Sequence, residues 1–199
     1  MSDKELVTAF ESFDLSPILM GALEKCGHKK PTPIQEKSIP ILKEGKDLLG
    51  LAQTGTGKTA AYSLPLLDKL FKNKKKARPA RMRALILTPT RELATQIFEN
   101  LKIYGKGMAF SNACVIGGEG KKLQIWAMGK GVDILVATPG RLLDLIKEGH
   151  VLFNQLEFFV LDEADKMFEL GFIHDVKKIM EKLPDERQSA FFSATMSPE

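Results

Sequence analysis

The chain has 199 residues, of which 44% are hydrophobic and 27% are charged, with a formal net charge of +4. This balance predicts one globular domain that buries its own core, and it argues against a disordered or collagen-like chain. Two widely separated cysteines and three histidines without ligand spacing argue against a disulfide scaffold and a zinc finger. The sequence shows neither a signal peptide nor an apolar run of ~18 residues, so we expect a cytoplasmic domain without membrane contact.

Two helices are predicted before the first strand. Ser16 and Thr32 each precede a proline, which is the order expected of an N-cap followed by the first helical residue, and Gly27 ends the first helix. Gln35 stands at the third helical position of the second helix, where its amide completes a Thr-x-x-Gln capping box with Thr32. Capping alone would therefore account for this glutamine.

From residue 47 onward, short apolar runs alternate with stretches of helical length. Strands are predicted at residues 47–52, 84–88, 113–116, 133–137, 158–161 and 190–192. Helices are predicted at residues 58–71, 91–104, 121–129, 139–148 and 164–182. Nearly continuous apolar runs are typical of strands buried on both faces, so the pattern predicts an α/β fold with a parallel sheet between two layers of helices. Ligands of such sheets bind at the carboxyl ends of the strands.

A basic segment interrupts this alternation. Eight lysines and arginines and no acid lie between Lys69 and Arg83, whereas the other residues hold 21 basic and 25 acidic side chains. Such a run is more often a solvated loop than a nucleic-acid patch, and the net charge alone does not decide between the two.

A glycine-rich loop follows the first predicted strand and opens a helix. Gly55 and Gly57 let the backbone turn its N–H groups toward phosphate oxygens, Lys58 can reach the β- and γ-phosphates, and the Thr59 hydroxyl can join a Mg²⁺ shell. The strict pattern asks for glycine at position 52, where this chain has alanine. The predicted nucleotide-binding loop comprises Ala52, Gln53, Thr54, Gly55, Thr56, Gly57, Lys58 and Thr59.

Two acids follow the fifth predicted strand. The buried strand would deliver Asp162 to the carboxyl edge of the sheet, where its carboxylate can hold Mg²⁺ through the water shell of the ion. Glu163 could orient or deprotonate an attacking water. Acids at a helix start often only favour the helix dipole, but their pairing with a phosphate loop predicts a Mg²⁺-dependent nucleoside triphosphatase with Lys58, Asp162 and Glu163 as its catalytic residues.

Asp162-Glu163-Ala164-Asp165 is the signature that names the DEAD-box RNA helicases, and the chain resembles that family in further motifs that occur in the family's order. These motifs are Pro89-Thr-Arg-Glu-Leu93, Gly117-Gly118, Thr138-Pro-Gly-Arg141 and Ser193-Ala-Thr195. The resemblance covers nearly the whole chain, and its wording is closest to bacterial members of the RhlE type. It implies a RecA-like fold, ATP and Mg²⁺ as cofactors, RNA as partner, and a likeness to the first of two helicase lobes.

The resemblance also implies roles at the nucleotide. Gly27 and residues 31–35 resemble the family's adenine-reading Q motif, so Gln35 is expected to pair with adenine. Phe10 occupies the family's upstream aromatic position and is expected near the base, although it would also suit an ordinary core. His28 stands where the family usually carries an aromatic residue that stacks on adenine, and an imidazole stacks less well.

Other motifs imply contacts with RNA and a coupling between the nucleotide site and RNA strand separation. In the family, the middle motifs hold the sugar-phosphate backbone of one RNA strand without reading bases. The residues concerned here are Pro89, Thr90, Arg91, Gly117, Gly118, Thr138, Pro139, Gly140 and Arg141. By resemblance, the hydroxyls of Ser193-Ala194-Thr195 bond with Asp165 and couple the nucleotide site to strand separation. The threonine and proline at 138 and 139 would equally serve as a helix start.

We therefore expect residues 1–45 to form N-terminal helices of the same lobe and residues 46–199 to form the ATP-binding domain. A second lobe, which would supply arginine fingers, is absent from this chain, so the chain is expected to be monomeric and nearly inactive alone. Two alternatives remain open at this point: a P-loop ATPase that acts on proteins or transport, and a binding module that uses nucleotide only as a switch.

Overall fold

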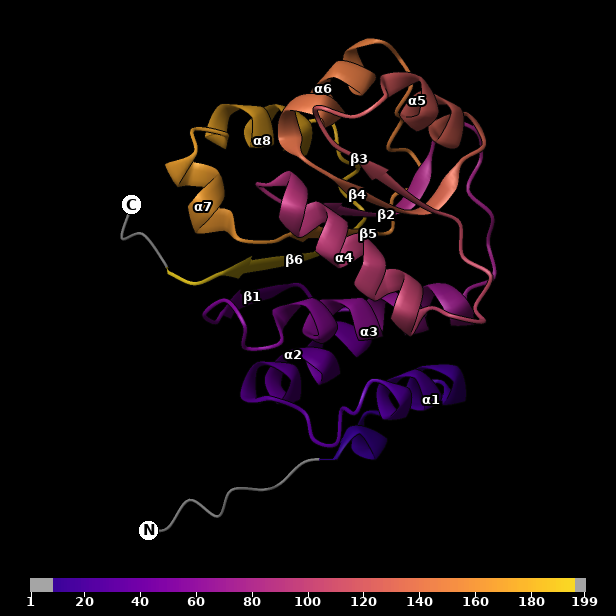
Figure 1. The fold of residues 1–199 in the computed structure, drawn as a ribbon, viewed down its shortest axis with the longest axis vertical. Coiled ribbons are helices and arrows are strands. Elements are labelled where there is room, and N and C mark those ends of the chain that lie inside the picture. The colour runs from indigo at the N-terminus through magenta and orange to yellow at the C-terminus, as the bar shows by residue number, and fades with distance from the viewer. Residues whose placement is uncertain (1–8, 196–199) are drawn as a thin grey trace.

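The computed structural model describes residues 9–195, so residues 1–8 of the predicted N-terminal region and residues 196–199 of the predicted ATP-binding domain lie outside it. Its centre is a six-stranded sheet in which every neighbouring pair is parallel, in the order β1-β6-β5-β2-β4-β3 (Figure 1). The strands are β1 Leu48–Leu51, β2 Met82–Leu87, β3 Asn112–Val115, β4 Val132–Ala137, β5 Phe158–Leu161 and β6 Gln188–Ser193. The predicted α/β fold with a parallel sheet is confirmed.

Helices cover both faces of this sheet. After a short 3-10 helix, η1 Phe10–Phe13, the helices are α1 Pro17–Lys25, α2 Pro33–Lys43, α3 Lys58–Lys72, α4 Arg91–Tyr104, α5 Lys121–Gly129, α6 Pro139–Lys147, α7 Ala164–Glu169 and α8 Ile173–Met180. One predicted helix, residues 164–182, is wrong as a single element. It is broken between α7 and α8, where Gly171 adopts a φ of +78° that an α-helix cannot contain.

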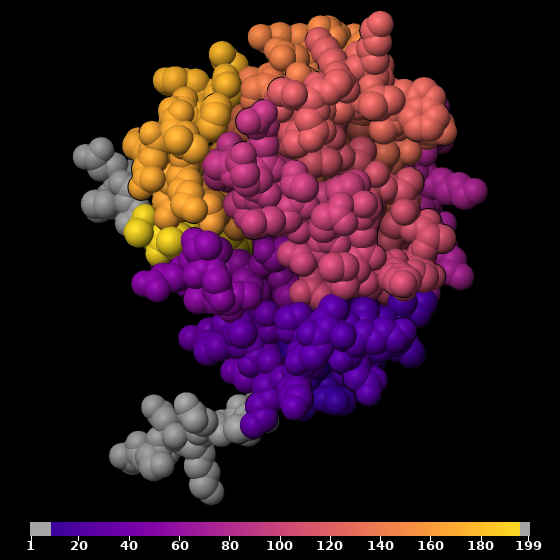
Figure 2. Space-filling model, in the orientation of Figure 1, coloured from indigo at the N-terminus to yellow at the C-terminus, as the bar shows by residue number. Residues whose placement is uncertain are grey.

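Two hydrophobic cores flank the sheet because alternate strand residues point to opposite faces. In β2, Ala84 and Ile86 join the core beneath α1–α4, whereas Leu85 and Leu87 join the core beneath α5–α8. The N-terminal helices contribute Leu19, Leu23, Ile39 and Leu42 to the first of these cores, and η1 contributes Phe10 and Phe13. Figure 2 shows this N-terminal segment, in indigo, as a continuous layer against the rest of the molecule.

The helix starts are where the sequence placed them, but their side chains do not all act as caps. Ser16, Thr32 and Thr138 are N-cap residues followed by proline. The side chains of Ser16 and Thr138 make no capping hydrogen bond, whereas Thr32 forms the predicted capping box with Gln35. The backbone N–H of Ser16 instead donates to Oδ1 of Asp68 at 2.8 Å. Within residues 9–195, no helix combines the length and apolar character needed to cross a bilayer.

Candidate nucleotide and RNA sites

The phosphate loop lies at the carboxyl end of β1, and α3 begins at its lysine. Gly55 and Gly57 have φ values of +84° and +93°, the left-handed conformations that glycine adopts without strain. The Lys58 side chain is only 6% exposed, and among the described residues its Nζ is buried without a hydrogen-bond partner. A buried ammonium group is costly unless an anion accompanies it, so this loop fits a phosphate group.

The two acids meet the phosphate loop from β5. Asp162 is 2% exposed, and its Oδ1 accepts a hydrogen bond from the N–H of Glu163 at 2.9 Å. Burial raises the pKa of Asp162 above its ordinary value, although the hydrogen bond from Tyr62 and the positive charge of Lys58 lower it. A buried carboxylate is the kind of protein oxygen ligand with which Mg²⁺ is usually held, so Asp162 fits the predicted metal role. Thr59 is the second residue of α3, directly after Lys58.

Tyr62 holds the other oxygen of Asp162. Its hydroxyl, on a side chain with no exposed surface, donates to Oδ2 at 2.8 Å. Burial and the adjacent Asp162 raise the pKa of this tyrosine well above its ordinary value, so the phenol keeps its proton and acts as a donor. Tyr62 was not predicted as a site residue, although its position four residues after Lys58 on a predicted helix places both on one helix face.

Glu163 is bound from both sides. Its Oε1 accepts a hydrogen bond from Oγ1 of Thr54 at 3.1 Å, and its Oε2 lies 2.7 Å from Nζ of Lys166. The backbone at Glu163 is left-handed, with a φ of +53°, which is uncommon for a residue with a side chain. The glutamate is thereby directed toward the phosphate loop rather than along α7.

Gln35 contacts the phosphate loop instead of standing apart from it. Its Oε1 accepts from the N–H of Thr32 at 3.0 Å, which is the predicted capping contact, and its Nε2 donates to the carbonyl of Gly57 at 3.1 Å. A Cβ on Gly57 would lie 2.4 Å from that Nε2, so the contact requires glycine. The glutamine is 2% exposed, with one donor and one acceptor position of its amide already used.

Phe10 and His28 share a hollow of their own. Both line a hollow of about 680 Å³ between η1 and the end of α1, and Gln35 does not line it. Phe10 is 3% exposed and packs edge-on against Phe13, with ring centroids 6.0 Å apart. The exposed His28 has its Nε2 3.2 Å from the hydroxyl of Tyr104. The structure therefore brings these two residues together at one hollow, and their predicted role at adenine stays a prediction.

The predicted RNA residues follow β2, β3 and β4, which are neighbours in the sheet. The guanidinium of Arg91 donates to the carbonyl of Gly117 at 3.4 Å and lies against Gly118, where a Cβ would be 2.1 Å from its Nη1. Arg141 reaches the same region, with its Nη1 3.2 Å from the carbonyl of Glu119. The motifs at 89–91, 117–118 and 138–141 thus form one surface at the carboxyl edge of the sheet.

Thr90 and Thr138 serve these helix starts differently. The Thr90 hydroxyl accepts from the N–H of Leu93 at 3.2 Å and caps α4. Pro89 precedes it in the turn after β2, and Pro139 and Gly140 open α6. Pro139 has no N–H to satisfy at that position.

Asp165 binds the segment after β6. Its Oδ2 accepts from the N–H groups of Ala194 and Thr195, both at 3.1 Å, and from the Thr195 hydroxyl at 3.3 Å, while Oγ of Ser193 accepts from the N–H of Asp165 at 3.3 Å. Burial raises the pKa of Asp165, but these hydrogen bonds and one from the N–H of Lys166 outweigh it, so the pKa lies below its ordinary value. The predicted contact between the two motifs is present.

Comparison with known proteins places these features in one group. Residues 32–199 match the DEAD/DEAH box helicases. The chain is 44% identical over 187 residues to the DEAD-box ATP-dependent RNA helicase CshA of Streptococcus pneumoniae, covering 94% of this chain and 35% of that protein. It is 45% identical over 193 residues to the ATP-dependent RNA helicase DeaD of Escherichia coli K12, covering 96% of this chain and 30% of that protein.

Solved structures agree with the relatives. A DEAD box protein from Methanococcus jannaschii superposes with a TM-score of 0.87 at 36% identity, over 95% of this chain and 50% of that one. A hypothetical ATP-dependent RNA helicase from Sulfolobus tokodaii gives a TM-score of 0.82 at 39% identity, over 92% and 52% of the two chains. The chain spans about a third of the length of the curated relatives above and about half of these two structures.

Proposed function

This chain belongs to the DEAD/DEAH box helicase family, and we propose that it is the N-terminal RecA-like lobe of an ATP-dependent RNA helicase that couples ATP hydrolysis to RNA unwinding or remodelling. The observation that carries the proposal is the buried ammonium of Lys58, which has no partner among the described residues and lies within the electrostatic reach of Asp162. A site of this charge arrangement is suited to a phosphate chain with its metal ion.

In the proposed site, Lys58 and the N–H groups of the phosphate loop bind the β- and γ-phosphates. Asp162, held by Tyr62, and Thr59 would hold Mg²⁺, which when bound neutralises phosphate charge. Glu163 orients the attacking water and accepts its proton at a carboxylate oxygen. The contact of Glu163 with Thr54 supports this role, because it fixes the carboxylate beside the loop.

The RNA role rests on the surface formed by Arg91, Gly118 and Arg141. It offers guanidinium groups, close backbone approach at a glycine and the N-terminus of α6, which are the elements that bind a sugar-phosphate backbone. No base edge would be read, so binding would be independent of sequence. The Asp165 contact with Ser193, Ala194 and Thr195 would couple this surface to the nucleotide.

The rest of the helicase would come from a second lobe. Since the relatives are about three times longer, we propose that a second RecA-like lobe closes the cleft and supplies arginine fingers, and that residues 1–45 belong to the first lobe. The shared core of Leu19 and Ile39 with α3 supports the latter assignment. The bacterial RhlE-like type, a cytoplasmic location, a monomeric state and the adenine roles of Gln35, Phe10 and His28 stay predictions; the relatives named above are CshA and DeaD.

The test is steady-state ATPase activity of the two-lobed protein and of this chain, with and without single-stranded RNA. We expect RNA-stimulated turnover only in the two-lobed protein, because an arginine finger is worth ~10³–10⁵ in rate, and loss of turnover in its Glu163→Gln variant. ATPase activity that RNA leaves unchanged would contradict the helicase proposal and favour an ATPase that acts on proteins or transport. Equal RNA-stimulated turnover in the lone chain would contradict the need for a second lobe.

A further inference from the structure

A second concave surface lies at the opposite edge of the sheet from the phosphate loop. It is a hollow of about 570 Å³ at the amino ends of β2 and β4, bounded by the end of α3 and by residues 108–111. Its wall includes residues 74–77, which belong to the connection between α3 and β2. None of the predicted nucleotide or RNA residues lines this hollow, so it is separate from both sites described above.

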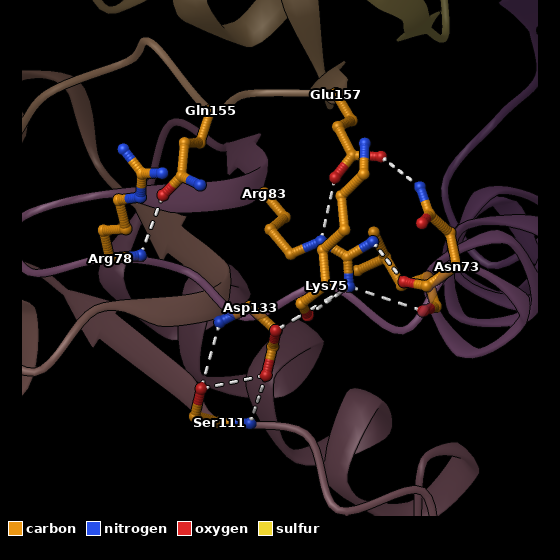
Figure 3. Close-up of polar contacts among 9 residues, drawn as sticks. Asn73, Lys75, Arg78, Arg83, Ser111, Asp133, Gln155 and Glu157 are labelled. Atoms are coloured by element: carbon orange, nitrogen blue, oxygen red, sulfur yellow. Dashed lines mark hydrogen bonds and ion pairs between the residues drawn. The ribbon is translucent and has the colours of Figure 1, made fainter.

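The connection, residues 73–81, is held in place by a buried arginine, as Figure 3 shows. Arg83 is 2% exposed and donates to the carbonyls of Asn73 at 2.7 Å and Lys75 at 3.2 Å. Its Nε pairs with Glu157 at 2.8 Å, and Glu157 in turn accepts from the Asn73 amide at 3.0 Å. The backbone of this loop is therefore preorganised.

The loop presents cations that nothing in residues 9–195 neutralises. Within that part of the chain, no carboxylate lies within ion-pair distance of Lys74, Lys75, Lys76 or Lys130, which all line the hollow. Some lysines elsewhere pair with a carboxylate, such as Lys72 with Asp68 at 2.9 Å, so what sets these four apart is that they line one hollow together. One carboxylate lines the hollow, but Asp133 already accepts two hydrogen bonds of 2.9 Å from Ser111.

An exposed aromatic residue borders one of these cations. Trp126 is 63% exposed on α5, and Nζ of Lys130 lies 3.5 Å from the centre of its ring. Phe71 and Phe110 add apolar surface to the hollow itself. Cations that track a backbone beside aromatic and apolar surface on which bases can rest are the two components of single-strand binding surfaces.

We propose that residues 74–76, Lys130 and Trp126 form an auxiliary binding surface for single-stranded RNA, which holds the phosphodiester backbone of a segment outside the helicase cleft. The auxiliary surface goes beyond the proposed function, because it does not involve Arg91 or Arg141. It would anchor RNA whether or not the proposed RNA surface at those two arginines is occupied. An acidic protein segment would suit the lysines but would make no use of the exposed indole, so RNA is the partner that the surface fits.

The first test measures binding of a fluorescein-labelled oligouridine to the chain by anisotropy over a range of salt concentrations. The triple variant Lys74→Gln, Lys75→Gln, Lys76→Gln should bind about 10- to 100-fold more weakly at low salt, and the slope of log K against log salt should be shallower by about 2, since each single-strand phosphate contributes ~0.7. The matched control, Lys177→Gln, Lys178→Gln, Lys182→Gln, removes the same charge from exposed positions on and after α8. Equal losses in both variants would mean non-specific attraction and would overturn the proposal.

The second test uses Trp126, the only tryptophan of the chain. RNA should quench its fluorescence in the wild type and in an Arg91→Ala, Arg141→Ala variant, which disables the proposed RNA surface at the carboxyl edge of the sheet. Quenching that disappears only in the Arg91→Ala, Arg141→Ala variant would assign RNA binding to the surface at the carboxyl edge alone and overturn the proposal. Polyglutamate that quenches where oligouridine does not would show a surface for acidic proteins and would overturn it as well. Absence of RNA-stimulated turnover in the two-lobed protein, with this quenching intact, would count against the proposed function only.

Discussion

The hydroxyl of Tyr62 donates a 2.8 Å hydrogen bond to Oδ2 of Asp162, which joins the first turns of α3 to the end of β5. Both groups are buried, so the contact fixes the carboxylate before any ligand arrives. Because Oδ1 is bound by the N–H of Glu163, neither oxygen of Asp162 is free to rotate away. The tyrosine is a positioning residue for the proposed metal ligand.

Replacing Tyr62 by phenylalanine should weaken the Mg²⁺ dependence of ADP affinity. A hydrogen bond to a charged group is worth ~1.5–3 kcal/mol, and its loss also leaves a buried carboxylate oxygen without its donor. We expect weaker ADP binding in Mg²⁺ and unchanged ADP binding in EDTA, both measured by calorimetry. Ser63→Ala is the matched control, since it removes a buried hydroxyl from the same helix that has no partner among residues 9–195. An equal loss with and without Mg²⁺ would show that the tyrosine acts only on the fold.

Lys58→Ala should separate nucleotide affinity from stability. The substitution removes the ammonium that we assign to the phosphates, so ADP affinity should fall by ~1.5–3 kcal/mol. The unliganded protein should unfold at the same or a higher temperature, because a buried charge without a partner is also removed. Calorimetry and thermal unfolding measure the two effects. Unchanged ADP affinity would exclude Lys58 from the site.

Gln35 has two roles that two variants can separate. Gln35→Glu keeps the acceptor for the Thr32 N–H but loses the donor to Gly57, whereas Gln35→Ala loses both, each neutral hydrogen bond being worth ~1 kcal/mol. If the amide reads adenine, the ratio of ADP to GDP affinity should fall in both variants by at least tenfold. A constant ratio together with lower stability would leave the glutamine as a cap and loop support.

Asp165 should make stability depend on acid pH. Its pKa is lower in the folded protein than the ordinary value, so its stabilising contribution is complete above about pH 4 and is lost as the pH falls through the folded pKa. Asp165→Asn should therefore lower the free energy of unfolding at neutral pH, by about 1 kcal/mol for a partly exposed group. It should also make that free energy fall less steeply with decreasing pH in the acid range. Urea unfolding at several pH values checks this. A variant whose free energy of unfolding falls as steeply in that range as that of the wild type would contradict it.

The two cysteines should react at different rates. Burial raises the pKa of the Cys114 thiol to about 11, so roughly a thousandth of it is thiolate at pH 8. Cys26 is exposed and should be alkylated first. Mass spectrometry after brief iodoacetamide treatment should find the label on Cys26, and a Cys26→Ser variant should stay unlabelled on that timescale. Rapid labelling of Cys114 would mean that α4 or β3 opens readily.

The parallel sheet was predictable because its strands are continuous apolar runs and each functional loop follows one of them. The phosphate loop and the acids carry their own local signals, which is why Lys58 and Asp162 were identified from residue type and spacing. The partner of Asp162 was not identified, because a contact between residues 100 positions apart depends on strand order. The break at Gly171 was missed for another reason: the apolar period continues across it, and only the backbone conformation shows the interruption.

The strand order divides the carboxyl edge of the sheet between two tasks. The proposed phosphate loop and acids follow β1 and β5, with the proposed coupling segment after β6 between them, whereas the proposed RNA residues follow β2, β4 and β3. The border between them is the pair of strands β5 and β2. Just beyond the last paired residues of these strands, the N–H of Asp162 donates a 2.9 Å hydrogen bond to the carbonyl of Leu87. A displacement of β5 by a phosphate would thus be transmitted through a single ladder to β2, the strand that precedes Arg91 in the chain. An isotope label on the amide of Asp162 would report, at this contact between β5 and β2, how binding of one ligand affects the other.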